Sequence, residues 1–388
     1  MLKLKEALAA GLRNNLLLFI MKVFETLHGG KKIQMNWHIR VLSFHLENCV
    51  TYPDPRLVIT MPPRSLKSLC GSIALALWAL GRDPSIKIIC VSYSDDLART
   101  FARQRMAIVE SAWFRALFPH LKFSKLTESE IVTTEGGGIY TTSIGGTLTG
   151  RGADMLIIDD PLKAGEAMSE AERRNVINWY KDTAYSRLND KERGIVIIIA
   201  QRTHPEDLPG FVMATDPECT LLKIPAIAPE KQSYMIRPGE YYERPAGQAL
   251  HAERESVESL LRTKGIIGSY NFEAQYQQNP LPMGGNMVKR EWFRTYKNKP
   301  VFEQIVQSWD TATETGDGKS WSVCVTAGIK ENQCCLLDVR RARMDYPTLR
   351  QAVIVQAGRW NAHRILIEKA ASGHALLQDL RRETGLSL

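Results

Sequence analysis

The stretch Arg56–Ser68, RLVITMPPRSLKS, decides the fold expected for this chain. Its residues Leu57 to Thr60 are apolar enough for a short buried strand, and a proline-rich turn follows them. Lys67 and Ser68 then open the apolar run LCGSIALALWAL, which is typical of a buried helix. A strand, a tight loop carrying Lys-Ser and a helix form the layout of a phosphate-binding loop. In such a loop backbone N–H groups and the lysine hold anionic oxygens, and the serine hydroxyl ligates magnesium.

The loop departs from the standard pattern GxxxxGK[ST], because Met61 and Leu66 occupy the two glycine positions. Pro62 and Pro63 have no N–H to donate and can only shape the turn. Taken alone, the stretch therefore leaves two interpretations open: a phosphate-binding loop, or a plain strand–turn–helix with a solvated lysine.

A second stretch, Met155–Asp160, is an apolar run that ends in two carboxylates. Buried parallel strands have this pattern, and α/β folds place their ligands at the carboxyl ends of such strands. In a magnesium-dependent NTPase the first carboxylate, here Asp159, holds the metal. The second, here Asp160, can orient and deprotonate the attacking water. The alternative is a strand that merely ends in an acidic turn.

Four motifs together resemble the large terminase subunit of tailed bacteriophages and prophages: MPPRSLKS, LTGRGADMLIIDDPLK, IIIAQRTHPEDLPG and FEAQYQQNP. The resemblance runs from about Asn36 to about Gly373. Members of that family are ATP-driven motors that pack DNA into an empty capsid, and they carry a nuclease that cuts the DNA. Many have PRHGKS or PRSGKS where this chain has Pro63, Arg64, Ser65, Leu66, Lys67 and Ser68.

The resemblance implies an α/β fold: a P-loop NTPase with a mainly parallel sheet flanked by helices, then an incomplete RNase H-like nuclease domain. The expected domains are an N-terminal helical segment (1–35), an ATPase domain (36–285) with a bracing subdomain (206–285), a linker (286–300) and the partial nuclease domain (301–388). Implied ligands and partners are ATP with Mg²⁺, double-stranded DNA, a portal protein, a small terminase subunit and further copies in a ring.

Composition agrees with a soluble DNA-acting protein of the bacterial cytoplasm. The 388 residues carry 50 Lys and Arg against 42 Asp and Glu, which gives a net charge of +8 and suits a polyanionic partner. The seven cysteines show no CxxC spacing, so reduced thiols are expected. No run of 18 apolar residues occurs, so no membrane span is expected, and residues 1–35 predict an amphipathic helix instead.

Further residues are assigned to the nucleotide site by the resemblance. Gln34 and Trp37 are candidates for adenine recognition, through an amide hydrogen bond or ring stacking, although Trp37 could equally anchor a helix. Gln201 and Thr203, at the end of the strand GIVIIIA, belong to the coupling motif that senses the terminal phosphate. Arg64 is the first candidate to supply positive charge to the transition state, and Arg151 and Arg187 are alternatives that could act on a neighbouring subunit.

The C-terminal region predicts three strands, a helix, a strand and a helix, which is the order of an RNase H-like fold. Asp310 and Glu368 end two of its strands and are candidates for holding two divalent metals, Mg²⁺ or Mn²⁺. The family uses a third acidic residue, but neither Asp317 nor Asp338 matches its position. A fragment of a longer protein or a shortened prophage reading frame explains this, and little or no DNA cleavage is expected.

The motor is therefore the expected function, with two alternatives. One is an inactive prophage remnant, which Leu66 and the early end of the chain favour. The other is a P-loop helicase or repair ATPase, which should show a second ATPase-like domain after residue 285, where the sequence has none.

Overall fold

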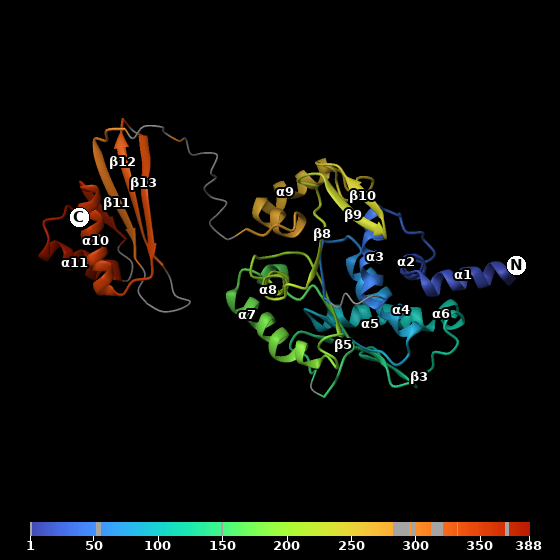
Figure 1. Ribbon diagram of the computed structural model, residues 1–388. Coiled ribbons are helices and arrows are strands. Elements are labelled where there is room, and N and C mark those ends of the chain that lie inside the picture. The colour runs from blue at the N-terminus through green and yellow to red at the C-terminus, as the bar shows by residue number, and fades with distance from the viewer. Residues whose placement is uncertain are drawn as a thin grey trace. The chain divides into compact units, whose positions relative to one another are not determined.

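The computed structural model describes residues 2–51, 56–148, 150–281, 295, 300–311, 321–331, 333–368 and 372–388. The chain divides into two compact units, Met1–Lys289 and Arg290–Leu388 (Figure 1). Most of the predicted linker, 286–300, lies outside the described residues.

The first unit is built on an eight-stranded sheet with the strand order β3-β4-β5-β2-β6-β7-β1-β8. All neighbours from β5 to β8 are parallel, whereas β4 pairs antiparallel with β3 and β5. The strands are β1 (Arg56–Thr60), β2 (Lys87–Ser92), β3 (Phe123–Leu126), β4 (Glu130–Thr133), β5 (Gly138–Ser143), β6 (Met155–Asp159), β7 (Ile195–Ala200) and β8 (Thr220–Lys223). This confirms the predicted mainly parallel sheet.

Apolar residues on both faces explain why the central strands are buried. Alternate side chains of one strand enter opposite cores, as Ile157 and Ile158 of β6 do. One core is closed by α2 (Leu16–Leu27), α3 (Trp37–Thr51), η1 (Leu69–Leu75), α4 (Ala76–Arg82), α5 (Asp95–Glu110) and α6 (Ala112–Leu117). The other is closed by α7 (Glu170–Asn178), η3 (Trp179–Ala184) and α8 (Leu208–Thr215). Short 3₁₀ turns are η2 (Ala164–Glu166) and η4 (Tyr185–Arg187).

The N-terminal segment forms two helices where the sequence predicted one. After α1 (Leu2–Asn14), Asn15 caps α2 by accepting a hydrogen bond from the Leu18 backbone N–H. Four α2 side chains then enter the core of the sheet: Leu16, Phe19, Ile20 and Val23. Among the described residues, no single helix is long and apolar enough to cross a membrane. The helices Glu6–Asn14 and Leu16–Leu27 reach the necessary length and apolar composition only when they are counted together, and they are bent by 105° relative to each other.

The predicted bracing subdomain contains the two-stranded sheet β9 (Gln232–Arg237) and β10 (Glu240–Arg244), then α9 (Val257–Asn271) and the helical turns of η5 (Phe272–Tyr276). Arg244 is fully buried and donates hydrogen bonds to the backbone carbonyls of Pro225, Ala226 and Gln248. These bonds fix the irregular 225–248 chain against the small sheet.

The second unit is a four-stranded sheet with the order β13-β12-β11-β14, and helices α10 and α11 pack on it. Its elements are β11 (Gln304–Asp310), β12 (Ser322–Lys330), β13 (Gln333–Ala342), α10 (Tyr346–Trp360), β14 (Arg364–Ile367) and α11 (Ser372–Glu383). The three-strand meander is antiparallel and β14 runs parallel to β11. This is the predicted order of three strands, helix, strand and helix.

Candidate functional site

Three strand ends bring the predicted nucleotide-site residues together. In the sheet, β7 lies between β1 and β6 and is parallel to both. The loop after β1, the two carboxylates after β6 and Gln201 after β7 therefore share one carboxyl edge. This is the edge at which α/β sheets bind ligands.

The loop after β1 takes the turn of a phosphate-binding loop without its glycines. Arg64 and Leu66 have φ values of 61° and 64°, a left-handed backbone that residues with a Cβ rarely adopt. Ser65 steadies the turn because its hydroxyl donates to the Pro62 carbonyl at 2.7 Å. From outside the loop, the Arg254 guanidinium donates to the Arg64 carbonyl. The loop runs into η1, a π-helical segment that continues as α4.

Lys67 reaches the second carboxylate. Its Nζ lies 3.0 Å from Asp160 Oδ2, and its side chain is only 6% exposed. The first carboxylate, Asp159, is buried and accepts hydrogen bonds from Ser68 Oγ at 3.0 Å and Ser72 Oγ at 2.5 Å. Burial, together with the negative charge of Asp160, raises the pKa of Asp159.

Asp160 also connects to the strand between the two motifs. Its Oδ1 accepts a hydrogen bond from the Gln201 backbone N–H at 3.0 Å. Asp160 has a φ of 44°, so the backbone turns sharply directly after β6. The Gln201 side-chain Oε1 is buried without a hydrogen-bond partner in the described structure. A buried polar atom of this kind is costly, and it suits an acceptor that meets a ligand donor.

Beyond Gln201, the coupling motif is locked by a buried ion pair. Asp207 accepts from Arg202 Nε at 2.9 and 3.0 Å with its two oxygens, and from the Thr203 backbone N–H at 3.0 Å. The Arg202 N–H donates to Gln278 Oε1 at 2.9 Å. Gln278 lies in the fourth motif of the sequence, FEAQYQQNP, so that motif holds the coupling segment in place.

Sequence reasoning missed Ser72, which a buried arginine contacts. Arg105, on the same helix as the exposed Arg99 and Arg103, is only 1% exposed. It donates to the Ser72 carbonyl at 2.6 Å and to Thr141 Oγ1 at 2.6 Å. Ser72 lies four residues after Ser68, and this helical spacing was the signal that could have revealed it. Gln278 gave no such local signal, because it lies 76 residues from Arg202.

Of the two adenine candidates, Trp37 is already packed against other aromatic side chains. Its ring stacks on Tyr242 with a centroid distance of 4.6 Å and an interplanar angle of 6°, and Tyr234 lies 5.1 Å away. The structure therefore favours the alternative role of Trp37 as a helix anchor over adenine stacking. Gln34 is exposed, and its Nε2 donates to Glu253 at 2.7 Å.

The three arginine candidates have different surroundings. Arg64 is exposed in the loop itself. Arg187 donates to the neighbouring Ser186 hydroxyl. Arg151 is held within the unit: its guanidinium lies 3.8 Å from the centre of the Tyr140 ring and 2.6 Å from Glu130.

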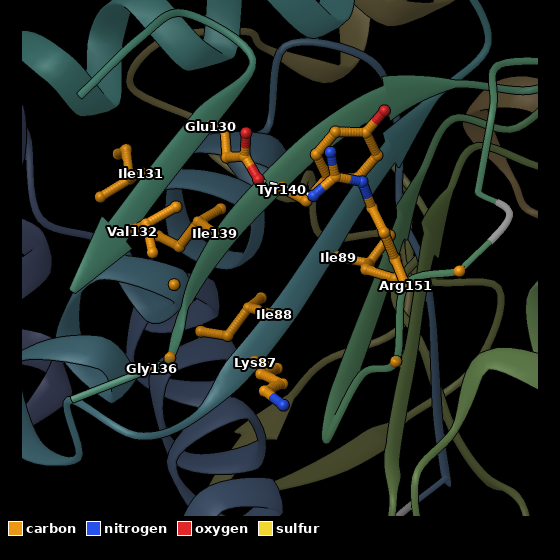
Figure 2. A pocket seen from close by; sticks show the side chains of 14 residues that line it. Lys87, Ile88, Ile89, Glu130, Ile131, Val132, Gly136, Ile139, Tyr140 and Arg151 are labelled. Atoms are coloured by element: carbon orange, nitrogen blue, oxygen red, sulfur yellow. Dashed lines mark hydrogen bonds and ion pairs between the residues drawn. The ribbon is translucent and has the colours of Figure 1, made fainter. Parts of the chain in front are cut away.

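Figure 2 shows the Arg151 side chain extending beside the Tyr140 ring, with the Glu130 carboxylate next to it. These residues line a cavity of about 230 Å³ over β2, β4 and β5. Arg151 would have to leave both partners in order to act on a neighbouring subunit.

The residues present fit a magnesium-bound nucleotide. Ser68 and Asp159 offer a hydroxyl and a carboxylate oxygen within 3.0 Å of each other, and hard oxygen donors of this kind suit Mg²⁺. Lys67 supplies a cation at the same edge, and the left-handed turns at Arg64 and Leu66 give the loop the curvature of an anion-binding nest.

The predicted nuclease carboxylates stand at the ends of neighbouring strands. The Glu368 backbone N–H donates to the Trp309 carbonyl at 3.0 Å, so Asp310 and Glu368 follow neighbouring parallel strands and both side chains are exposed. Gly373 lies against this site, because a Cβ there would come within 1.9 Å of the Glu368 carbonyl oxygen.

No third ligand joins them among the described residues, which contain no cluster of three metal-binding side chains. Asp338 is engaged elsewhere: it accepts hydrogen bonds from Gln356 Nε2 at 2.6 Å and Trp360 Nε1 at 3.2 Å. Its role is therefore to fasten α10 to the sheet. Asp317 lies outside the described residues.

Comparison with known proteins identifies the second unit. The model of the terminase RNaseH-like domain matches residues 307–387. No curated protein matches the sequence. Among solved structures, the HK97 bacteriophage large terminase has 13% identity, covers 97% of this chain and 83% of its own, and gives a TM-score of 0.45.

Two further solved structures of phage large terminases are similar to this chain. The large terminase of a thermophilic bacteriophage in complex with ADP has 7% identity over 87% of this chain and 79% of its own, with a TM-score of 0.36. A mutant ATPase domain of the Thermus phage P74-26 large terminase has 12% identity over 58% and 89%, with a TM-score of 0.39. The family match over residues 307–387 confirms the resemblance to the terminase large subunit and assigns this part of the chain to terminase RNaseH-like domains.

Proposed function

We propose that this protein is an ATP-driven motor subunit that moves double-stranded viral DNA into a procapsid. One observation carries the proposal. Lys67, from the loop after β1, contacts Asp160 after β6 at 3.0 Å, and Ser68 contacts Asp159 at the same distance. Two motifs far apart in the sequence thus form one cationic and acidic edge, as ATP hydrolysis requires.

In this proposal each residue of the edge has one task. Ser68 and Asp159 hold Mg²⁺, and Lys67 with the loop residues 63–68 binds phosphate oxygens. Bound Mg²⁺-ATP supplies the phosphoanhydride whose hydrolysis drives the motor. Asp160 accepts the proton of the attacking water, and Arg64 supplies positive charge near the transferred phosphate.

The coupling step is proposed to start at Asp160. Because its Oδ1 accepts from the Gln201 N–H, a displacement of this carboxylate moves the start of the coupling motif. Arg202 then connects the motif to Gln278, and Gln277 forms two hydrogen bonds with the Ile227 backbone in the brace. Thr203 is fixed by Asp207 in the same network. The hydrolysis state of the site would thereby reach the bracing subdomain.

The proposed partners follow from the motor. They are double-stranded DNA, a portal protein, a small terminase subunit and further copies of this chain in a ring in the bacterial cytoplasm. A net charge of +8 supports the DNA partner. In the second unit, Asp310 and Glu368 are the residues that would hold Mg²⁺ or Mn²⁺, and little or no cleavage is proposed because the described residues contain no cluster of three metal-binding side chains.

The alternative of an inactive remnant was based in part on Leu66. Its side chain does not prevent the turn, because Leu66 takes a φ of 64° and the loop still delivers Lys67 to Asp160. This observation supports a working loop in spite of the missing glycine.

The test is DNA-stimulated ATP hydrolysis by the full chain and by a Lys67→Ala variant. A motor hydrolyses ATP faster when duplex DNA is added, and the variant does not. If the wild-type protein shows no hydrolysis with or without DNA, the remnant is the better reading. Packaging that depends on portal and procapsid then separates a motor from a helicase.

A further inference from the structure

A buried arginine is connected to Asp159 through a single serine. Arg105, on α5, is 1% exposed and donates to the Ser72 carbonyl at 2.6 Å. The Ser72 hydroxyl in turn donates to Asp159 Oδ2 at 2.5 Å. Arg105 also donates to Thr141 Oγ1 of β5 at 2.6 Å. Helix α5, the segment η1 and strand β5 are therefore joined by one chain of hydrogen bonds, and this chain ends on the carboxylate of Asp159.

The π-helical winding of η1 makes the Ser72 carbonyl accessible to Arg105. In an α-helix this carbonyl would accept from the backbone N–H four residues later, that of Ala76. The Ala76 N–H instead donates to the Ile73 carbonyl. Arg105 supplies a donor to the Ser72 carbonyl and so fixes the turn from which the Ser72 hydroxyl reaches Asp159. π-Helical turns of this kind occur frequently at functional sites.

Arg105 also brings a buried positive charge to this edge of the sheet. Both of its acceptors are neutral oxygens, so neither of them cancels the charge. Burial lowers the pKa of Arg105, whereas the neighbouring Cys90 and Asp159 raise it. A buried guanidinium is costly without a negative group nearby. Since Lys67 forms its ion pair with Asp160, Arg105 supplies a second positive charge for two adjacent carboxylates.

The two oxygens of Asp159 are held by two different serines. Oδ1 accepts from Ser68, which is itself a proposed magnesium ligand, and Oδ2 accepts from Ser72, which is not. A residue that binds a metal ligand rather than the metal orients that ligand, and its loss lowers metal affinity by about 10- to 100-fold. Ser72 occupies this place beside Asp159, and Arg105 fixes Ser72.

Resting on the proposed function, we propose that Arg105, acting through Ser72, is a positioning residue of the magnesium site. It holds η1 against β6, so that the Ser72 hydroxyl keeps the Asp159 carboxylate in one orientation. It also provides the positive charge that lets two neighbouring carboxylates remain together in a buried place. Neither residue touches the nucleotide in this proposal, and their effect is on how tightly the site holds Mg²⁺.

The test is the free Mg²⁺ concentration at which the full chain half-maximally binds a fluorescent ATP analogue, measured by anisotropy in metal-buffered solutions. We expect Ser72→Ala and Arg105→Met to need about 10- to 100-fold more Mg²⁺ than the wild type. Arg105→Lys retains the charge, so its Mg²⁺ requirement should lie between those of the wild type and Arg105→Met. ATP hydrolysis by these variants should recover as Mg²⁺ is raised, which a general loss of structure would not show.

Arg244→Met is the matched control. Arg244 is also fully buried and donates to the Pro225 and Ala226 carbonyls, but it lies in the bracing subdomain. This variant should lose stability, as thermal melting measures, and retain the wild-type Mg²⁺ requirement. The role of Arg105 is overturned if Arg105→Met needs no more Mg²⁺ than Arg244→Met.

The remaining outcomes separate this inference from the proposed function. If Arg105→Met does not fold, Ser72→Ala decides, because Arg105 acts through that serine, and a wild-type Mg²⁺ requirement in Ser72→Ala overturns the proposal. If the wild type does not bind the analogue, or binds it equally with and without Mg²⁺, the proposed nucleotide site fails and this inference fails with it. If the wild type needs Mg²⁺ and the variants need no more than Arg244→Met, the proposed function stands and this inference alone is wrong.

Discussion

The ammonium nitrogen of Lys67 lies 3.0 Å from Asp160 Oδ2, and Lys67 is almost completely buried at that contact. A buried lysine needs a partner, since desolvation of an unpaired ammonium is costly. Asp160 is that partner and is itself held by the Gln201 N–H. The two motifs and the strand between them are thus mutually stabilising, and the same three segments form the proposed catalytic edge.

Replacing this lysine tests the edge directly. In Lys67→Ala the cation that binds phosphate oxygens is lost, and we expect turnover to fall by about 10² to 10³, the usual effect of removing one electrostatic donor. Steady-state release of phosphate measures this. Lys181→Ala, which alters an exposed lysine of η3, is the matched control and should hydrolyse ATP like the wild type. If Lys67→Ala hydrolysed ATP as fast as Lys181→Ala, Lys67 would have no role in hydrolysis.

Leu66 offers a test of backbone geometry. A left-handed residue with a Cβ costs about 1–2 kcal/mol, and a β-branched side chain is tolerated least. Leu66→Ile retains volume and apolarity but adds the branch, so we expect a loss of about 1–2 kcal/mol in stability and slower ATP hydrolysis. Leu66→Gly removes the conflict and should retain hydrolysis. Thermal melting and phosphate release check both, and a Gly variant less active than the Ile variant would contradict this account.

Asp159 predicts how stability depends on pH. Burial and the neighbouring Asp160 raise its pKa above the ordinary 3.8, so the folded protein binds a proton more tightly than the unfolded chain does. Stability therefore falls as pH rises from 3.8 through the raised folded pKa. Asp159→Asn cannot ionise, and without divalent metal at pH 8 we expect it to be more stable than the wild type by more than about 1 kcal/mol.

Melting temperatures between pH 5 and pH 8 in chelator measure this effect. Asp182→Asn, at an exposed aspartate of η3, is the control and should follow the wild-type curve. If the melting temperatures of the wild type and Asp159→Asn changed with pH in the same way, the ionisation of Asp159 would not destabilise the folded protein, and this prediction would be wrong. The stabilised variant should also lose ATP hydrolysis, because the amide is a poorer magnesium ligand than the carboxylate.

The arginine that assists hydrolysis is tested by Arg64→Ala. Arg64 is exposed at the loop and free of the contacts that hold Arg151 to Tyr140 and Glu130. If Arg64 supplies charge to the transition state, turnover falls by about 10³ to 10⁵ while ATP binding changes little. Titration with a fluorescent ATP analogue separates binding from turnover. Arg99→Ala, at an exposed position on α5, provides the control, and survival of turnover in Arg64→Ala would move the role to another arginine.

Local sequence patterns were sufficient for the residues at strand ends. Lys67, Ser68, Asp159 and Asp160 each follow a buried apolar run, and parallel strands bring their carboxyl ends to one edge. The order of the second unit was equally local, because strand and helix periodicities alternate without long insertions. Recognition of these elements needed no knowledge of tertiary contacts.

Side-chain environments were harder to predict because their partners are distant. Trp37 stacks on Tyr242, about two hundred residues along the chain, and nothing near Trp37 indicates this. Arg105 shares its helix with the exposed Arg99 and Arg103, but it lies on the face that packs on the sheet, where it donates to Thr141 of β5. Gln278 accepts from the Arg202 N–H although it lies 76 residues further along the chain.

The carboxylate pair Asp310 and Glu368 leads to a prediction about cleavage. Two-metal hydrolysis needs ligands that clamp both ions, and the described residues hold no cluster of three such side chains. We therefore expect purified protein to leave supercoiled plasmid largely intact with Mg²⁺ or Mn²⁺, as judged by conversion to the nicked form on agarose gels. Asp310→Ala controls for contaminating nuclease, since contaminant activity persists in that variant. Nicking by the wild type that disappears in Asp310→Ala would establish that this pair, with whatever completes it, is a working metal site.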